Sequence, residues 1–282
     1  MKLLQPYPPF SVRTDSAAFR VMAPLAPDRI TSVRSRILEM LSAPHGQLYP
    51  TEIVDSGLAH ELLVETGVIS ALHARFQRTI FVLPDLNVHV NQFGNNNRFD
   101  GWHRDCGNEM ARSRRYVFEQ QYRVWKVGIY LQANDGVHGG GINIVPNSEQ
   151  HVLRKGRGAS AAVPLRALES QLRARASVAF GRGRLVPLEA GDIFAFDSRV
   201  LHQSTPARQV NSIAGEDKIV FYFSFADSAR SAQWYAWNVF LRACEDGTRL
   251  HREALALDEA TFQRGDLISS EVCQFVVAHS GL

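Results

Sequence analysis

His103 and Asp105 lie two positions apart in the segment Trp102-His103-Arg104-Asp105. In an extended segment, side chains at this spacing point to the same face, so an imidazole and a carboxylate could bind one metal ion. His202, which follows a second β-rich run, could supply a third ligand. Two neutral imidazoles and one carboxylate on an octahedral metal leave three positions open, which suits Fe(II) binding a bidentate oxo-acid and O2. These three residues are therefore the candidate ligands of a catalytic metal ion, with Fe(II) as a suitable ion.

The ligands need a rigid framework, and the middle of the chain has the composition of one. Between residues 79 and 226, short segments rich in β-branched and aromatic residues alternate with turn-forming stretches. The expected strands are Thr79 to Leu83, Leu86 to Phe93, Arg123 to Leu131, Gly141 to Val145, Asp192 to Phe196 and Lys218 to Phe225. No regular helix follows each strand, as a parallel α/β sheet would require. An antiparallel barrel or sandwich is therefore predicted.

Helices are expected on both sides of this β core, which spans about residues 79–226. Apolar residues recur at helical spacing from Asp28 to Leu41 and from Ala59 to Phe76, which predicts a helical N-terminal part over residues 28–77. Ala229 to Cys244 and Asp258 to Val277 predict helical elements within residues 229–280. Because no Pro/Gly/Ser-rich linker interrupts the chain, residues 1–282 are interpreted as a single domain.

Composition limits the classes of partner. The 282-residue chain has a formal net charge of +3, and its basic residues are scattered, so we expect no nucleic-acid partner. No run of about 18 apolar residues occurs, so we expect a soluble protein without membrane contact. The three cysteines have no CxxC spacing, which argues against disulfides or structural zinc and favours the cytoplasm. The expected partner is a small-molecule substrate, and the oligomeric state stays open.

Four motifs occur in a recognisable order between Leu86 and Ala226. They are Trp102 to Asp105, Val127 to Leu131 followed by Gly140 to Ser148, Glu189 to Asp192 with its aromatic strand, and Leu201 to Ser204. This ordered set resembles the phytanoyl-CoA dioxygenase family of Fe(II)/2-oxoglutarate-dependent oxygenases. The resemblance implies a mainly β fold with flanking helices around a double-stranded β-helix, the jelly-roll core also found in cupins. It also implies Fe(II) as the cofactor, with 2-oxoglutarate and O2 as cosubstrates.

One motif departs from the family pattern. The family has Pro-Gly-Ser-His after the glycine-rich strand, whereas this chain has Pro146-Asn147-Ser148-Glu149. Asn can adopt the left-handed conformation that Gly otherwise supplies, so the turn is expected to persist. His151, which lies nearby, is interpreted as structural and is left out of the metal site.

The family anchors the distal carboxylate of 2-oxoglutarate with a cation, usually an arginine at the start of the last core strand. Lys218 holds that place here, 16 positions after His202. A lysine pairs with a carboxylate as a point charge, without the bidentate fork of arginine. Arg208 is the second candidate for this cosubstrate contact. Lys126 is the third, because some related oxygenases present a lysine from the equivalent strand.

Three polar residues are further candidates for binding the cosubstrate. Ser204 resembles a family position that can hydrogen-bond the 2-oxoglutarate carboxylate. Asn91 and Gln92 lie on the strand that leads into the His-x-Asp segment, and one of them must face the interior because strand side chains alternate. Alternation alone does not select between them.

The expected reaction is hydroxylation of an unactivated C–H bond in a small molecule, with release of succinate and CO2. Relatives that halogenate carbon have a small residue in place of the metal-bound carboxylate, whereas Asp105 is present here. Desaturation, epoxidation and ring closure remain open, and biosynthesis of a secondary metabolite is the expected setting. Two alternatives belong to other classes: a cupin-like metal-binding or small-molecule-binding protein without catalysis, and a zinc hydrolase that uses the same three ligands.

Overall fold

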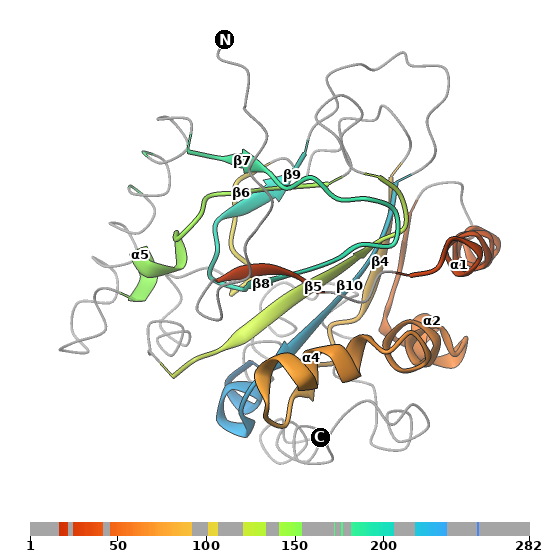
Figure 1. Cartoon of the computed structure of the whole chain (residues 1–282), viewed down its shortest axis with the longest axis horizontal. Helices are drawn as coiled ribbons and strands as arrows, with labels where there is room; N and C mark the ends of the chain where they lie inside the picture. The colour runs from red at the N-terminus through yellow and green to blue at the C-terminus, as the bar shows by residue number, and fades with distance from the viewer. Residues whose placement is uncertain are drawn as a thin grey trace, which may run out of the picture.

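Two antiparallel β-sheets face each other at the centre of the protein (Figure 1). The larger sheet has the order β1-β8-β5-β10-β4-β2, with β3 paired to β10, and the smaller sheet has the order β7-β6-β9. The larger sheet contains β1 (Ala18–Val21), β2 (Gly46–Leu48), β3 (Phe81–Val82), β4 (Asn87–Asn91), β5 (Val124–Tyr130), β8 (Ile193–Asp197) and β10 (Lys218–Ala226). The smaller sheet contains β6 (Ile142–Ile144), β7 (Arg184–Leu185) and β9 (His202–Ser204). The predicted antiparallel, mainly β architecture is confirmed.

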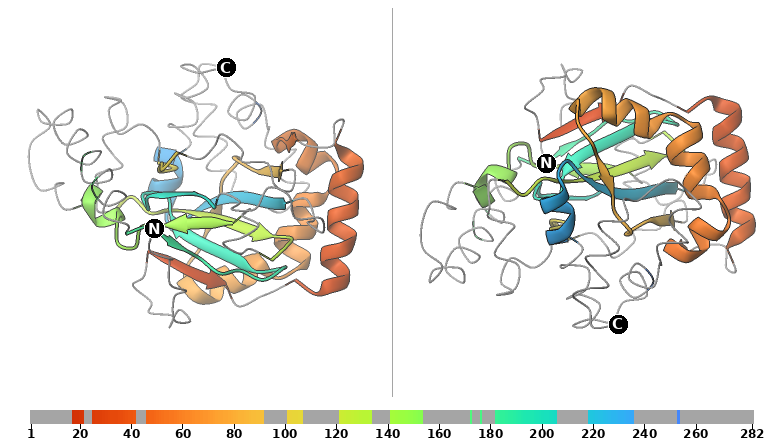
Figure 2. Two further views of the ribbon diagram at one scale, coloured as in Figure 1. Left: turned by 90° about the horizontal axis from the view of Figure 1, so that it is seen from above. Right: turned by 90° about the horizontal axis from the view of Figure 1, so that it is seen from below.

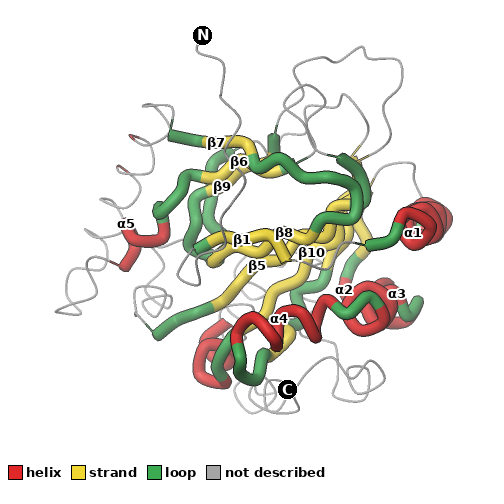
Figure 3. The backbone as a smooth tube through the Cα atoms, in the orientation of Figure 1, coloured by secondary structure: helices red, strands yellow, loops and turns green. Residues whose placement is uncertain are grey.

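The computed structural model describes most of the β core and the N-terminal helices. The described residues are 17–21, 25–41, 46–91, 101–106, 121–133, 141–153, 172, 176, 182–205, 218–235 and 253. Figure 3 shows β6, β7 and β9 on one side of the interior and β1, β5, β8 and β10 on the other.

The central strands β5 and β10 have two chemically different faces. Alternate residues such as Val127, Ile129 and Phe223 are fully buried in the core that the larger sheet forms with the helices. The intervening residues, such as Tyr130 and Val220, pack toward the smaller sheet instead. Because strand side chains alternate, the first set holds the fold together while the second set lines the interior between the sheets.

Helices from the first quarter of the chain cover the outer face of the larger sheet. They are α1 (Pro27–Met40), α2 (Pro50–Asp55), α3 (Leu58–His60), the π-helical turn η1 (Glu61–Glu65) and α4 (Val68–Phe76). In Figure 2 the red-orange helix α1 runs across one end of the strands, and the orange helices lie beside it. Helix α1 starts with proline, which has no N–H to satisfy at that position, and buries Ile30, Val33 and Ile37.

The continuous helix predicted from Ala59 to Phe76 is interrupted. Gly67 adopts the left-handed conformation, with φ of 75°, between η1 and α4. Apolar periodicity alone does not reveal this break, because Leu62, Leu63, Val68 and Leu72 are all fully buried on either side of it.

The C-terminal helical prediction is only partly testable. Residues 229–235 are helical. The rest of Ala229 to Cys244 and all of Asp258 to Val277 lie outside the described residues. Between β6 and β7, the chain also forms α5 (Glu149–Leu153). Among the described helices, none has the length and apolar character needed to span a membrane.

The turn before α5 has the conformation expected of its asparagine. Asn147 has φ of 59°, the left-handed region that a glycine would occupy in the family pattern. The next residue, Ser148, accepts a hydrogen bond from the backbone N–H of Leu201 at 2.7 Å. The turn is thereby tied to the residue that precedes His202.

Candidate metal centre

The backbone brings His103 and His202 together. The His103 N–H donates to the His202 carbonyl at 2.9 Å, and the His202 N–H donates to the His103 carbonyl at 3.0 Å. This isolated antiparallel bridge places the His-x-Asp segment beside the start of β9. Residues separated by almost a hundred positions therefore share one short stretch of strand pairing.

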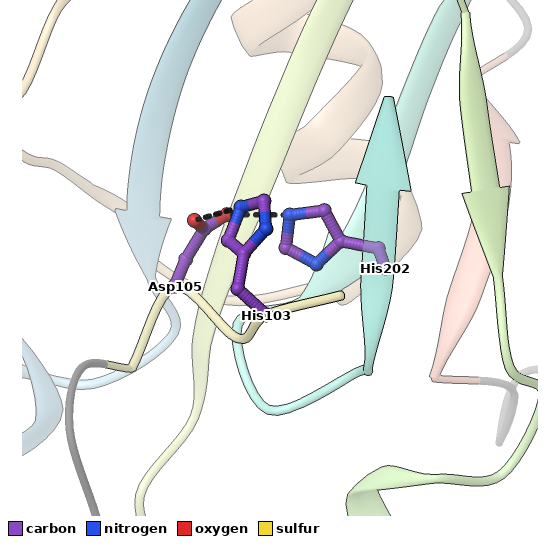
Figure 4. Close-up of side chains that lie close together, drawn as sticks. All are labelled: His103, Asp105 and His202. Carbon is purple, nitrogen blue, oxygen red and sulfur yellow. Dashed lines mark ion pairs between the residues drawn. The ribbon is translucent and has the colours of Figure 1, made fainter. Parts of the chain in front are cut away.

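The side chains of His103, Asp105 and His202 converge on one point (Figure 4). One potential ligand atom from each residue lies within 4.8 Å of the other two. The Asp105 carboxylate is 3.8 Å from His103 Nε2 and 3.5 Å from His202 Nε2. Two donors bound to one ion at about 2.1 Å lie no more than about 4.2 Å apart. The cluster therefore needs only small side-chain rotations to hold a metal ion.

Both histidine rings are oriented by backbone carbonyls. His103 Nδ1 lies 2.8 Å from the Gly101 carbonyl, and His202 Nδ1 lies 3.0 Å from the Val200 carbonyl. A carbonyl can only accept, so each hydrogen bond requires the proton on Nδ1 and leaves the Nε2 lone pair available. Such contacts to the second ring nitrogen are usual for metal-binding histidines.

Burial and charge differ across the three residues. Burial lowers the pKa of His202 to about 4, partly offset by the nearby Asp105 carboxylate. The ring is therefore neutral at pH 7, as a metal ligand must be. The His202 side chain is only 8% exposed, whereas that of His103 is 50% exposed, so the cluster is accessible from the His103 side. On its buried side, Phe196 packs against His202 with ring centroids 4.6 Å apart.

Tyr130, Tyr222 and His89 also line the interior, and the sequence analysis did not single them out. The Tyr130 hydroxyl is fully buried, and its side chain interacts with that of Tyr222. Burial raises the pKa of Tyr130 well above its usual value, so its phenol stays protonated and can donate. A Cβ at Gly128 would lie 2.8 Å from the Tyr130 ring and 3.0 Å from the Tyr222 ring. Tyr130 lies four positions after Lys126, and Tyr222 lies four positions after Lys218, so strand alternation places each tyrosine on the same face as the lysine. This spacing is the signal that could have identified the two tyrosines.

Lys126 points into the same interior but already has a carboxylate partner. Its Nζ lies 2.8 Å from Asp85 Oδ2; the Asp85 side chain is buried, and that of Lys126 is 12% exposed. The same oxygen accepts hydrogen bonds from Ser224 at 2.7 Å and from Tyr235 at 2.5 Å. Lys126 therefore belongs to a polar network in which Asp85 already compensates its charge.

Lys218 occupies the first position of β10, opposite Asn91 of β4. It is only 8% exposed, and strand alternation puts it on the same face as Val220, which packs toward the smaller sheet. Its Nζ lies 3.4 Å from the Ala133 carbonyl, a long contact for a charged donor. Lys218 thus places a buried cation at the start of β10, on the face that lines the interior between the sheets.

The structure describes some of the remaining candidates and not others. Ser204 lies on β9 two residues after His202, on the same face of the strand, and pairs with Ile142. Arg208 and Gln92 lie outside the described residues. The roles assigned to these residues remain predictions.

Comparison with known proteins adds information about the fold. No protein-family profile matches the sequence, and no curated protein matches it significantly. AviO1 from Streptomyces viridochromogenes Tue57 is similar in structure, with a TM-score of 0.50 at 17% identity, over 76% of this chain and 91% of AviO1. HygX from Streptomyces hygroscopicus, solved with nickel and 2-oxoglutarate bound, gives a TM-score of 0.52 at 11% identity, over 76% and 83% of the two chains.

These comparisons and the sheet topology define the class of fold. The protein shares a mainly antiparallel, double-stranded β-helix fold with AviO1 and HygX. At this level the resemblance inferred from the sequence is confirmed. The described core also contains a candidate facial triad of two histidines and one aspartate.

Proposed function

We propose that this protein is an Fe(II)- and 2-oxoglutarate-dependent dioxygenase that hydroxylates an unactivated C–H bond of a small molecule, releasing succinate and CO2. The observation that carries the proposal is the convergence of His103, Asp105 and His202 inside a double-stranded β-helix. These residues would hold Fe(II) through two Nε2 atoms and one carboxylate oxygen. When bound, Fe(II) with 2-oxoglutarate and O2 supplies the oxidation of a C–H bond coupled to decarboxylation of the oxo-acid.

Two interior residues fit the distal carboxylate of 2-oxoglutarate. Lys218 supplies a buried positive charge, and Tyr130, which lies beside Tyr222, supplies a buried, protonated hydroxyl. Burying a carboxylate is unfavourable unless charge and hydrogen bonds compensate it, and this pair can provide both. We therefore propose that Lys218 is the cation that anchors the distal carboxylate of 2-oxoglutarate and that Tyr130 donates a hydrogen bond to the same carboxylate.

The apolar part of the interior would limit the access of water. Phe194, Phe196, Ile142 and Ile144 are buried between the two sheets beside the candidate ligands. A dry interior strengthens the electrostatic contacts to the cosubstrate and protects reactive species from side reactions. The exposed His103 side would be the approach for the substrate, because the other imidazole is buried against Phe196.

The presence of Asp105 favours hydroxylation over halogenation, because the carboxylate occupies the coordination position that a halide would need. We propose a secondary metabolite or similar small organic compound as the substrate. The cytoplasm is the proposed location, since the three cysteines of the sequence lack CxxC spacing.

Anaerobic calorimetry with Fe(II), followed by 2-oxoglutarate, tests the proposal directly. We expect one Fe(II) per chain, and oxo-acid binding that requires the metal. On exposure to air, the loaded protein should form succinate slowly even without its substrate. His202→Ala should abolish both iron binding and succinate formation.

His73→Ala is the matched control, because His73 is an exposed histidine on helix α4 and its Nδ1 contacts the Arg78 carbonyl. It should keep the iron affinity and succinate formation of the unaltered chain. Iron binding without any succinate would point to the non-catalytic binding protein. Hydrolytic activity with Zn(II), unchanged by Lys218→Met, would point to the hydrolase.

A further inference from the structure

The three candidate ligands come from two segments that meet along one loop. Besides the His103–His202 backbone bridge, the Cys106 N–H donates to the Ser198 carbonyl at 3.1 Å. Arg104, which lies between the two ligands of the first segment, donates from Nε to the Arg199 carbonyl at 2.8 Å. The path of residues 197–202 therefore determines where the His-x-Asp segment lies.

A buried ion pair shapes this loop. Asp197 Oδ1 accepts hydrogen bonds from the Arg199 backbone N–H and from Arg199 Nε, both at 2.9 Å. Asp197 Oδ2 accepts from Arg199 Nη2 at 2.6 Å. The Val200 N–H closes the turn by donating to the Asp197 carbonyl at 2.8 Å. These contacts fix both the side chains and the backbone of the loop.

The loop is connected directly to a ligand. The Val200 carbonyl, in the middle of the turn, accepts from Nδ1 of His202 and so sets the direction of its Nε2 atom. The Arg199 carbonyl holds Arg104 on the other segment. Both ligand segments therefore take their positions from atoms of the turn that the ion pair holds.

Stability alone does not account for such a pair. Asp197 is 5% exposed and Arg199 is 3% exposed, so both charges are removed from water. The cost of desolvating two charges often equals or exceeds their attraction, and apolar replacements of buried pairs are frequently as stable. The geometry of the turn is a more specific benefit, because a bidentate guanidinium–carboxylate contact allows few arrangements.

We propose that Asp197 and Arg199 are positioning residues for the metal ligands, acting through the turn at residues 197–202. This inference rests on the proposed iron site. Loss of a group that orients a metal ligand typically weakens metal binding by about 10–100-fold. Asp197→Asn, which keeps the size of the side chain but weakens its contacts with Arg199, should lower Fe(II) affinity by an amount in that range.

The test compares Asp197→Asn with Asp227→Asn as a matched control. Asp227 is equally buried at 5% exposure and lies near Arg78, with 3.5 Å between the charged groups. It is close enough to Asp197 for the two charges to repel each other, but among the described residues it makes no hydrogen bond or ion pair with the ligand segments. Fe(II) affinity is measured by anaerobic calorimetry, Co(II) absorption reports the coordination geometry, and thermal unfolding is followed without metal. Asp197→Asn should weaken Fe(II) binding and alter the Co(II) spectrum, whereas Asp227→Asn should lower only the melting temperature.

If Asp197→Asn does not fold, Arg199→Lys decides the question, because lysine keeps the charge but not the bidentate geometry. It should also weaken Fe(II) binding and change the Co(II) spectrum. Unaltered affinity and spectrum in the folded variant would overturn the inference while leaving the iron site intact. A lack of Fe(II) binding by the unaltered chain would instead overturn the proposed function and this inference together.

Discussion

Replacing Lys218 and Lys126 separately by methionine should distinguish a cosubstrate anchor from a structural cation. Both lysines lie on inward-facing positions of neighbouring strands, but Lys126 is paired with Asp85 at 2.8 Å. A hydrogen bond to a charged group contributes about 1.5–3 kcal/mol. Lys218→Met should therefore weaken 2-oxoglutarate binding by about 10–150-fold. Its effect on the binding of Fe(II) alone should be small.

Lys126→Met should have the opposite profile. It leaves the Asp85 carboxylate buried without its cation, and breaking a buried ion pair costs about 3–5 kcal/mol of stability. Ser224 and Tyr235 still donate to Asp85, which favours the lower end of that range. A loss of about 3 kcal/mol should lower the melting temperature by roughly 6–12 °C. The affinity of the folded variant for 2-oxoglutarate should change little.

Anaerobic calorimetry of the metal-loaded variants, together with thermal unfolding by circular dichroism, separates the two profiles. The assignment of Lys218 would be refuted if Lys218→Met bound 2-oxoglutarate with the affinity of the unaltered chain. Loss of affinity in the folded Lys126→Met variant alone would transfer the anchoring role to Lys126.

Three further predictions concern single positions. Gly128→Ala should lower stability by about 1–3 kcal/mol in urea unfolding, because the added Cβ would lie 2.8 Å from the Tyr130 ring. Asn147→Gly should keep full stability in the same assay, whereas Asn147→Ala should lose about 1–2 kcal/mol because its φ is 59°. Burial lowers the pKa of His89 to about 4, below about 6.5 in the unfolded chain, so its contribution to stability is complete above pH 6.5 and is lost as pH falls toward 4. His89→Asn should make the stability of the metal-free protein less dependent on pH in that window, which denaturant titrations at several pH values would measure.

The central strands could be predicted from the sequence because their local composition and their tertiary setting agree. The prediction of Arg123 to Leu131 contains β5, and the prediction of Lys218 to Phe225 differs from β10 only at its last residue. Both strands are buried on two faces and therefore consist of long apolar and aromatic runs. The short strands β1, β2, β7 and β9 were not predicted, since pairing with neighbours defines them more than local preference does.

The candidate site was predictable to a different degree. His103 and Asp105 could be predicted to act together because side chains two positions apart in a strand point to the same face. The choice of His202 as the third ligand depended on the order of motifs along the chain. The structure brings the three side chains together, and metal binding stays a prediction. The role of Lys126 could not be predicted, because its partner Asp85 is 41 positions away and no local pattern links them.

The two faces of β5 and β10 explain how a shared fold can coexist with little shared sequence. The face toward the helices is apolar and needs only suitable volume and patterning, requirements that many different sequences satisfy. The interior face carries Lys126, Tyr130, Lys218 and Tyr222, and these can change without altering the packing of the opposite face. Strand alternation thus separates the residues that build the sheet from those that determine its chemistry. For this reason, the structural similarity to AviO1 and HygX establishes the architecture even at 11–17% sequence identity, while the substrate must be found by experiments on the interior side chains.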